Sequence, residues 1–135
     1  MMQMLGFIID CPDPLLLAAF YSGVTGGPVA DGSSESMALI NFADVDLTFQ
    51  RVKNYRAPQW PDGEHPKQFH IDFEVDDIEV EQGRVLVLGA TLQQNSIGPD
   101  GYGWRVDTDP AGHPFCLCCH EGVSRVGGRV AWPSH

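Results

Sequence analysis

The chain alternates between short apolar strands and amphipathic helical segments, and the same order occurs twice. Residues 6–27 have the pattern of a strand, a turn, a helix and a glycine, and residues 70–91 repeat it. Asp13 and Asp77 precede the two predicted helices and superpose at an offset of 64 residues, which places Gly6 on His70. Such a repeat predicts two similar half-domains that bury their apolar faces together.

The periodicity of the apolar residues predicts the order strand, helix, three strands in each half. The strands are expected over residues 5–11, 37–42, 46–52, 70–75, 91–97, 103–108 and 114–119, with a further short strand from Val29. The helices are expected over residues 15–24 and 77–88, and the buried stripe of the first is Leu16, Ala19, Phe20 and Gly23. The predicted class is α+β, in which each half is a small mixed sheet with a helix on one face.

Alternation along the first strand of each half separates an apolar face from a polar one. The apolar face, which should cover the helices, carries Phe7, Ile9, Ile71, Phe73 and Val75. The polar face carries Asp10, His70, Asp72 and Glu74. Because these side chains are too polar for a second core, we expect them to line a concavity or to meet solvent.

The length, net charge and apolar runs of the chain exclude several classes of function. A chain of 135 residues is expected to form one domain. The net charge of −10 opposes binding to a nucleic-acid backbone. No apolar run reaches the roughly 20 residues of a membrane span, and the N-terminus has no signal-peptide pattern. We therefore expect a cytoplasmic protein that binds neither nucleic acid nor membrane, with its four cysteines as free thiols.

Several segments together resemble the vicinal oxygen chelate superfamily, which has the glyoxalase, bleomycin-resistance and dioxygenase fold. These segments are residues 11–14, 19–21, 70–78, 88–90 and 107–118, and the resemblance covers about residues 3–120. The sequences of these segments are most similar to those of small glyoxalase-like proteins of bacteria. The resemblance implies a homodimer and two βαβββ modules whose eight strands curl around a shared, ligand-binding cup.

The implied domain organisation is a single domain over residues 1–120 followed by a tail. The modules are residues 1–53 and 69–120, the linker is 54–68, and the tail is 121–135. The tail has three glycines and no clear period, so we expect it to be loosely ordered or to pack on a neighbour, with Trp132 near its end.

The resemblance also implies four metal-ligand positions on cup-facing strands. In this sequence they fall on Gly6, Gln50, His70 and Cys116. Gly6 cannot ligate and Gln50 is a poor neutral donor, so the resemblance implies a cup without an intact four-ligand metal site. The alternative is a divalent metal such as zinc or nickel, which accept His and Cys, held by His70, Gln50 and Cys116.

Each candidate residue has a functional and a structural interpretation. His70, the candidate catalytic residue, is either a proton shuttle or a hydrogen-bond donor in the cup, and Asp72 could orient its ring only across the 6.5–7 Å or so that separates alternate strand residues. Cys116 is either a nucleophile or a buried, inert thiol. Trp60 and Trp104 are expected to roof a ligand, and Trp60 alternatively plugs the linker against the sheet.

For two further groups the structural interpretation is favoured. His113, in the turn before the last predicted strand, is expected to be exposed and structural. Arg51, Lys53 and Arg56 are expected to be ion-paired surface residues rather than an anion site, because the chain is so acidic.

The function that these features favour is binding of a small organic molecule in the cup. The candidate ligand-binding residues are Asp10, Gln50, Trp60, His70, Asp72, Trp104 and Cys116. Three alternatives stay open: a metal-dependent lyase, isomerase or dioxygenase of the glyoxalase kind; a resistance protein that sequesters a cationic drug or toxin; and an association module with a vestigial cup.

Overall fold

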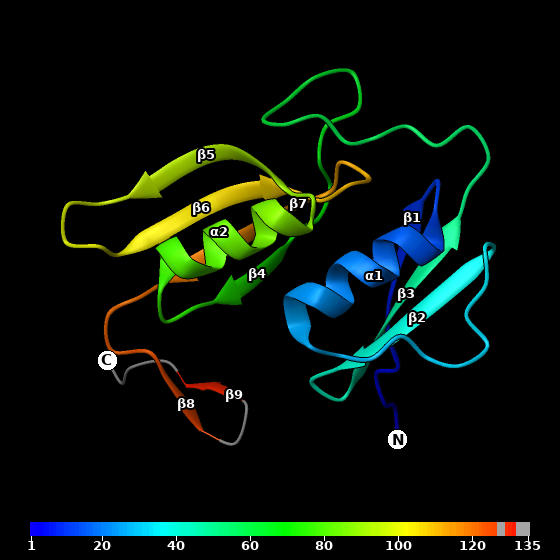
Figure 1. Ribbon diagram of the computed structural model, residues 1–135, viewed down its shortest axis with the longest axis horizontal. Coiled ribbons are helices and arrows are strands. Elements are labelled where there is room, and N and C mark those ends of the chain that lie inside the picture. The colour runs from blue at the N-terminus through cyan, green and yellow to red at the C-terminus, as the bar shows by residue number, and fades with distance from the viewer. Residues whose placement is uncertain (127–128, 132–135) are drawn as a thin grey trace.

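The computed structural model, which describes residues 1–126 and 129–131, contains two mixed sheets that are each covered by one helix (Figure 1). The first sheet has the order β1-β3-β2 and comprises β1 (Gly6–Cys11), β2 (Met37–Phe42) and β3 (Val45–Arg51). In it β1 is parallel to β3, and β2 is antiparallel to β3. The covering helix is α1 (Pro14–Thr25).

The second module repeats this arrangement with one more strand. Its sheet has the order β4-β7-β6-β5 and comprises β4 (Ile71–Glu74), β5 (Thr91–Ile97), β6 (Gly103–Thr108) and β7 (Pro114–Cys119). The first strand β4 is parallel to β7, as β1 is to β3. The covering helix is α2 (Ile78–Leu88), which packs beside α1 (Figure 1). The predicted α+β class and the repeat are therefore confirmed.

The first module lacks the full fourth strand that the sequence analysis expected. Only a single bridge forms, between Val29 and Ile40. Pro28, which has no backbone N–H, precedes this bridge, and Gly32 in the turn that follows adopts a φ of 85°. A strand cannot extend in either direction from there, so the two module sheets contain seven strands rather than eight.

Both helices begin at the aspartates that marked the repeat. The Asp13 side chain accepts a hydrogen bond from the backbone N–H of Leu16, and the Asp77 side chain accepts from Glu79 and Val80. These bonds satisfy backbone N–H groups that have no partner inside the helix. The predicted helix starts are thus correct to within a residue.

One apolar core spans the two modules, and it changes the expected buried face of α1. The helix buries Leu17, Ala18, Phe20 and Tyr21, whereas Leu16 is 50% exposed. The predicted stripe is therefore wrong except for Phe20. The ring of Tyr21 stacks on Phe49 of its own module at 5.5 Å and meets Phe115 of the second module edge-on at 6.3 Å. Because α1 must contact both modules, its buried face is rotated from the stripe that one sheet alone would select.

The described part of the tail forms a short antiparallel hairpin. It consists of β8 (Ser124–Val126) and β9 (Arg129–Ala131), which the sequence analysis did not predict. Trp132 lies outside the described residues, as do residues 127–128 and 133–135. Among the described residues, no helix has the length and apolar character that crossing a membrane requires.

Candidate functional site

A hollow of about 470 Å³ lies beside β1, between that strand and the linker. Its walls include Phe7, Ile8 and Asp10 of β1, Arg56 and His65 of the linker, Phe69, and His113 from the turn before β7. Both modules and the linker therefore contribute to one concavity. Its volume is within the range of about 300–1,000 Å³ that small-molecule sites occupy.

The hollow combines an apolar wall with a few polar groups. Phe7 and Phe69 are 39% and 55% exposed, and their ring centroids are 5.7 Å apart. On the linker, Nη1 of Arg56 lies 3.3 Å from Nε2 of His65. A concavity with mostly apolar walls and a small number of placed polar groups is typical of a ligand site.

His113 connects the turn before β7 to β1. Its Nε2 donates to the backbone carbonyl of Asp10 at 2.6 Å. The hydroxyl of Tyr55 lies 3.2 Å from the same nitrogen and donates to the carbonyl of Ala111 at 2.7 Å. Since a carbonyl oxygen only accepts, the proton of a neutral His113 is on Nε2. His113 is partly buried rather than exposed as expected, because it reaches across to the other module.

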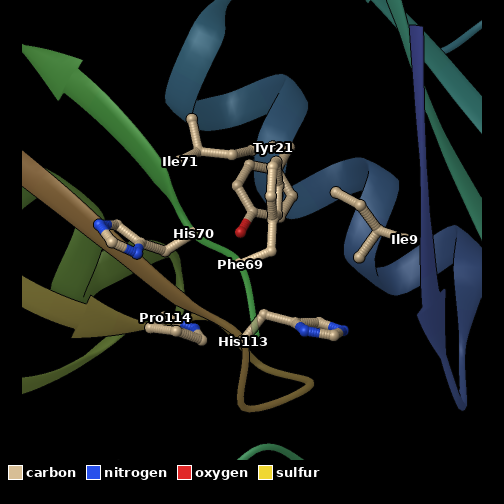
Figure 2. A pocket seen from close by; sticks show the side chains of 7 residues that line it. All are labelled: Ile9, Tyr21, Phe69, His70, Ile71, His113 and Pro114. Carbon is tan, nitrogen blue, oxygen red and sulfur yellow. The ribbon is translucent and has the colours of Figure 1, made fainter. Parts of the chain in front are cut away.

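A second, much smaller cavity shares Ile9, Phe69 and His113 with the hollow, and His70 also lines it. It measures about 20 Å³, which is room for a single water molecule. Figure 2 shows the ring of His113 directed toward Ile9 of β1, whereas the ring of His70 is directed away from it. The two histidines therefore serve different surfaces, one in the hollow and the other on the face of β4 and β7.

Three candidate ligands meet on that face. His70, Asp72 and Cys116 each offer an atom that could hold a metal, and these atoms all lie within 4.8 Å of one another. Nε2 of His70 is 3.3 Å from Oδ1 of Asp72. From sequence, the contact between His70 and Asp72 was uncertain because alternate strand residues are so far apart. His70 lies just before β4, and its long imidazole side chain spans the distance to Asp72.

The surroundings of Cys116 favour its protonated thiol. Burial raises the pKa of the Cys116 thiol to about 12, and the negative charge of Asp72 adds to this rise. Burial likewise raises the pKa of Cys118, the next thiol on the same face, to about 12. Because the thiolate is the nucleophilic form, this environment disfavours Cys116 as a nucleophile and agrees with the inert-thiol interpretation.

The two candidate tryptophans, Trp60 and Trp104, lie outside the hollow. Trp60 is half-buried against Val106, Cys116 and Cys118, and Nζ of Lys67 lies 4.3 Å from its ring centroid. Trp60 thus covers the second sheet, as the plug interpretation predicted. Trp104 is 46% exposed on β6.

The carboxylate of Glu74 also lies outside the hollow. It accepts hydrogen bonds from the backbone N–H of His120 and from its Nδ1, each at 2.7 Å.

The sequence pattern of the glyoxalase-like domain matches residues 6–118, which is most of the chain. The chain belongs to the glyoxalase-like family. No curated protein sequence matches it significantly. Within this family assignment, the fold resemblance inferred from sequence is confirmed.

Solved structures share the glyoxalase-like fold at low sequence identity. A glyoxalase-related enzyme from Fulvimarina pelagi superposes with a TM-score of 0.74 at 16% identity, covering 99% of this chain and 100% of that chain. A glyoxalase/bleomycin resistance protein/dioxygenase family enzyme from Burkholderia phytofirmans PsJN gives 0.69 at 17%, covering 87% and 98%. The fosfomycin resistance protein FosX from Mesorhizobium loti gives 0.63 at 16%, covering 87% and 91%. At these identities the likeness shows the fold alone.

The four metal positions that the family resemblance implied cannot all supply a side-chain ligand in this glyoxalase-like chain, because one of them is Gly6. A Cβ atom on Gly6 would overlap the carbonyl oxygen of Asp46 on β3, so no side chain fits there without a backbone shift. The 64-residue offset pairs Asp72 with Ile8, and the strand registers then make Thr48 the equivalent of Cys116 and Gln50 the equivalent of Cys118. Of the implied set, His70 and Cys116 come together, and Asp72 joins them.

Sequence reasoning missed most of the hollow. Of the candidate ligand-binding residues, only Asp10 lines it. Arg56 and His65 lie in a linker without periodicity, so no pattern could place them. Phe69 could have been found as an apolar residue immediately before the predicted polar strand face.

Proposed function

We propose that the chain binds a small organic molecule in the hollow between β1, the linker and the turn before β7. The observation that carries this proposal is the open volume of about 470 Å³ lined by exposed aromatic rings and a few polar side chains. A vestigial cup would be filled by side chains. Trp60 covers the second sheet in this way, since it packs against Val106, Cys116 and Cys118. The hollow beside β1 is open, which supports binding over the association-module alternative.

Filling the hollow tests the proposal. Ile8 lies in the wall and is 65% exposed, so Ile8→Trp adds bulk to the hollow without disturbing the core. The matched control is Met37→Trp, at an exposed position of β2 outside the hollow. Saturation-transfer NMR with a panel of small aromatic and aliphatic fragments should show binding to the unmodified chain and to Met37→Trp, and its loss in Ile8→Trp. Equal binding to both variants would contradict the proposal.

A second candidate function, metal-assisted chemistry, is favoured by the meeting of His70, Asp72 and Cys116. A nitrogen, a carboxylate oxygen and a sulfur suit zinc, which in catalytic sites keeps three protein ligands and one open position. Zinc at such a position would supply a Lewis acid and lower the pKa of bound water. The chain's own residues would hold the ion, and Cys116 would have to release its proton on binding.

Cobalt(II) titration of the purified chain tests the metal candidate without an activity assay. Coordination by Cys116 should give a cobalt–thiolate charge-transfer band, which Cys116→Ser should abolish. Cys118 lies on the same face but outside the cluster, so Cys118→Ser is the matched control and should retain the band. Absence of the band in the unmodified chain, together with no uptake of zinc, would dispose of this candidate.

A further inference from the structure

The charge of the hollow differs from that of the whole chain. The chain has 18 acidic residues against 8 lysines and arginines, yet the hollow is lined by one acidic residue, Asp10, and by Arg56 and His65. Among the described residues, Arg56 has no carboxylate within ion-pair distance. An arginine that stays unpaired in so acidic a chain, and that lines a concavity, is available to an anionic ligand.

Arg56 is held in place by a neutral partner. The guanidinium can only donate hydrogen bonds, so Nε2 of His65 accepts from Nη1 of Arg56 at 3.3 Å. This contact uses one of the five N–H groups of the side chain and leaves the others for a ligand. The planar guanidinium matches a carboxylate, which can receive two parallel hydrogen bonds.

The aromatic wall indicates what the anion is attached to. Phe7 from β1 and Phe69 at the end of the linker line the same hollow, with ring centroids 5.7 Å apart and planes inclined by 37°. Both rings remain partly exposed. An aromatic ligand body would cover them in an offset or edge-to-face arrangement, and each such contact adds to the gain from the apolar area that it buries.

We infer that the ligand of the hollow is a small aromatic carboxylate, whose charged group Arg56 binds and whose ring packs against Phe7 and Phe69. This inference rests on the proposed function and specifies its ligand class. The cationic ligand that a sequestering resistance protein would bind is disfavoured, because Arg56 would repel it. Asp10 limits the negative charge of the ligand, since a second carboxylate near it would be repelled.

Three probes of nearly equal shape separate charge from ring packing. Benzoate is anionic, benzamide neutral and benzylammonium cationic, and each can be titrated into the full chain by NMR at low and at high salt. The variant is Arg56→Gln, and the matched control is Arg51→Gln, an exposed arginine on β3 outside the hollow. Asp10→Asn serves as the reciprocal variant, because it removes the opposing charge.

Benzoate should bind the unmodified chain at least tenfold more tightly than benzamide or benzylammonium, by the usual strength of charge-assisted hydrogen bonds. Arg56→Gln should lower benzoate affinity about tenfold and leave benzamide affinity unchanged. Arg51→Gln should change neither, Asp10→Asn should strengthen benzoate binding, and added salt should weaken it.

The outcomes distinguish this inference from the proposed function. If benzamide or benzylammonium binds as tightly as benzoate, or if Arg56→Gln leaves benzoate binding unchanged, the inference is overturned while the hollow remains a binding site. If none of the three probes binds and the wider fragment panel also fails, the inference and the proposed function are overturned together.

Discussion

The hydroxyl of Tyr21 donates a hydrogen bond of 2.6 Å to Oδ2 of Asp109, and this bond joins helix α1 to the turn before β7. Both residues are buried, with 1% and 4% exposure. The other carboxylate oxygen, Oδ1, accepts from the backbone N–H groups of Ala111 and His113. Asp109 therefore fixes the turn that carries His113 into the hollow, and Tyr21 fixes Asp109.

Tyr21→Phe should lower the free energy of unfolding by about 1–3 kcal/mol, because Oδ2 of Asp109 would stay buried without its donor. Urea unfolding followed by circular dichroism measures the difference. Tyr55→Phe is the matched control: its hydroxyl is only partly buried and donates to the carbonyl of Ala111, so the expected loss is about 1 kcal/mol or less. Equal stability of Tyr21→Phe and the unmodified chain would show that this bond contributes nothing.

Asp107→Asn should stabilise the protein at neutral pH by about 1 kcal/mol. Asp107 is fully buried and Nε2 of Gln82 donates to its Oδ1, while Oδ2 of Asp107 and Oε1 of Gln82 have no hydrogen-bond partner among the described residues. An asparagine amide in place of Oδ2 could donate to Oε1 of Gln82. The measurement is urea unfolding at pH 7.5.

The pH dependence of this effect follows from the pKa of Asp107. Burial raises that pKa above its ordinary value of 3.8. The folded chain then binds the proton more tightly than the unfolded chain, so the contribution of Asp107 to stability is lost as pH rises through its folded pKa. The advantage of Asp107→Asn should therefore shrink as the pH falls toward 3.8. A constant advantage at all pH values would contradict this account.

Gly6→Ala should destabilise the protein by about 2 kcal/mol or more, since a methyl group there overlaps the carbonyl oxygen of Asp46 and the paired strands must separate. Gly83→Ala on α2 is the matched control because a Cβ there meets nothing within 4 Å. It should instead stabilise the helix by about 0.5–1 kcal/mol. Thermal unfolding of both variants gives the comparison, and a tolerated Gly6→Ala would refute the close approach of β1 and β3.

The sequence predicted the repeat, the helix starts and the fold class because these depend on local patterns. Asp13 and Asp77 cap their helices through bonds to residues two or three positions ahead. Strand alternation likewise placed Asp72 on the face of His70, and the family resemblance placed Cys116 on a cup-facing strand, which the register pairs with Asp72. Such features need no knowledge of how the modules pack.

What depends on packing between modules was not predictable from those patterns. The buried face of α1 is set by Tyr21, which contacts residues of the other module. The place of the hollow depends on where Arg56 and His65 come to lie, and a linker with three prolines carries no periodic signal. The homodimer and the cytoplasmic location stay predictions.

The linker that forms one wall of the hollow takes part in neither module sheet. If the hollow binds a ligand as proposed, exchanges at Arg56 or His65 would alter which molecule is recognised without disturbing strand pairing or the shared core. Substitutions in this linker could then change ligand specificity, and selection for folding would scarcely constrain them. Chains with this architecture can accordingly diverge in what they bind while their sheets stay superposable, so shared shape is a weak guide to shared substrate.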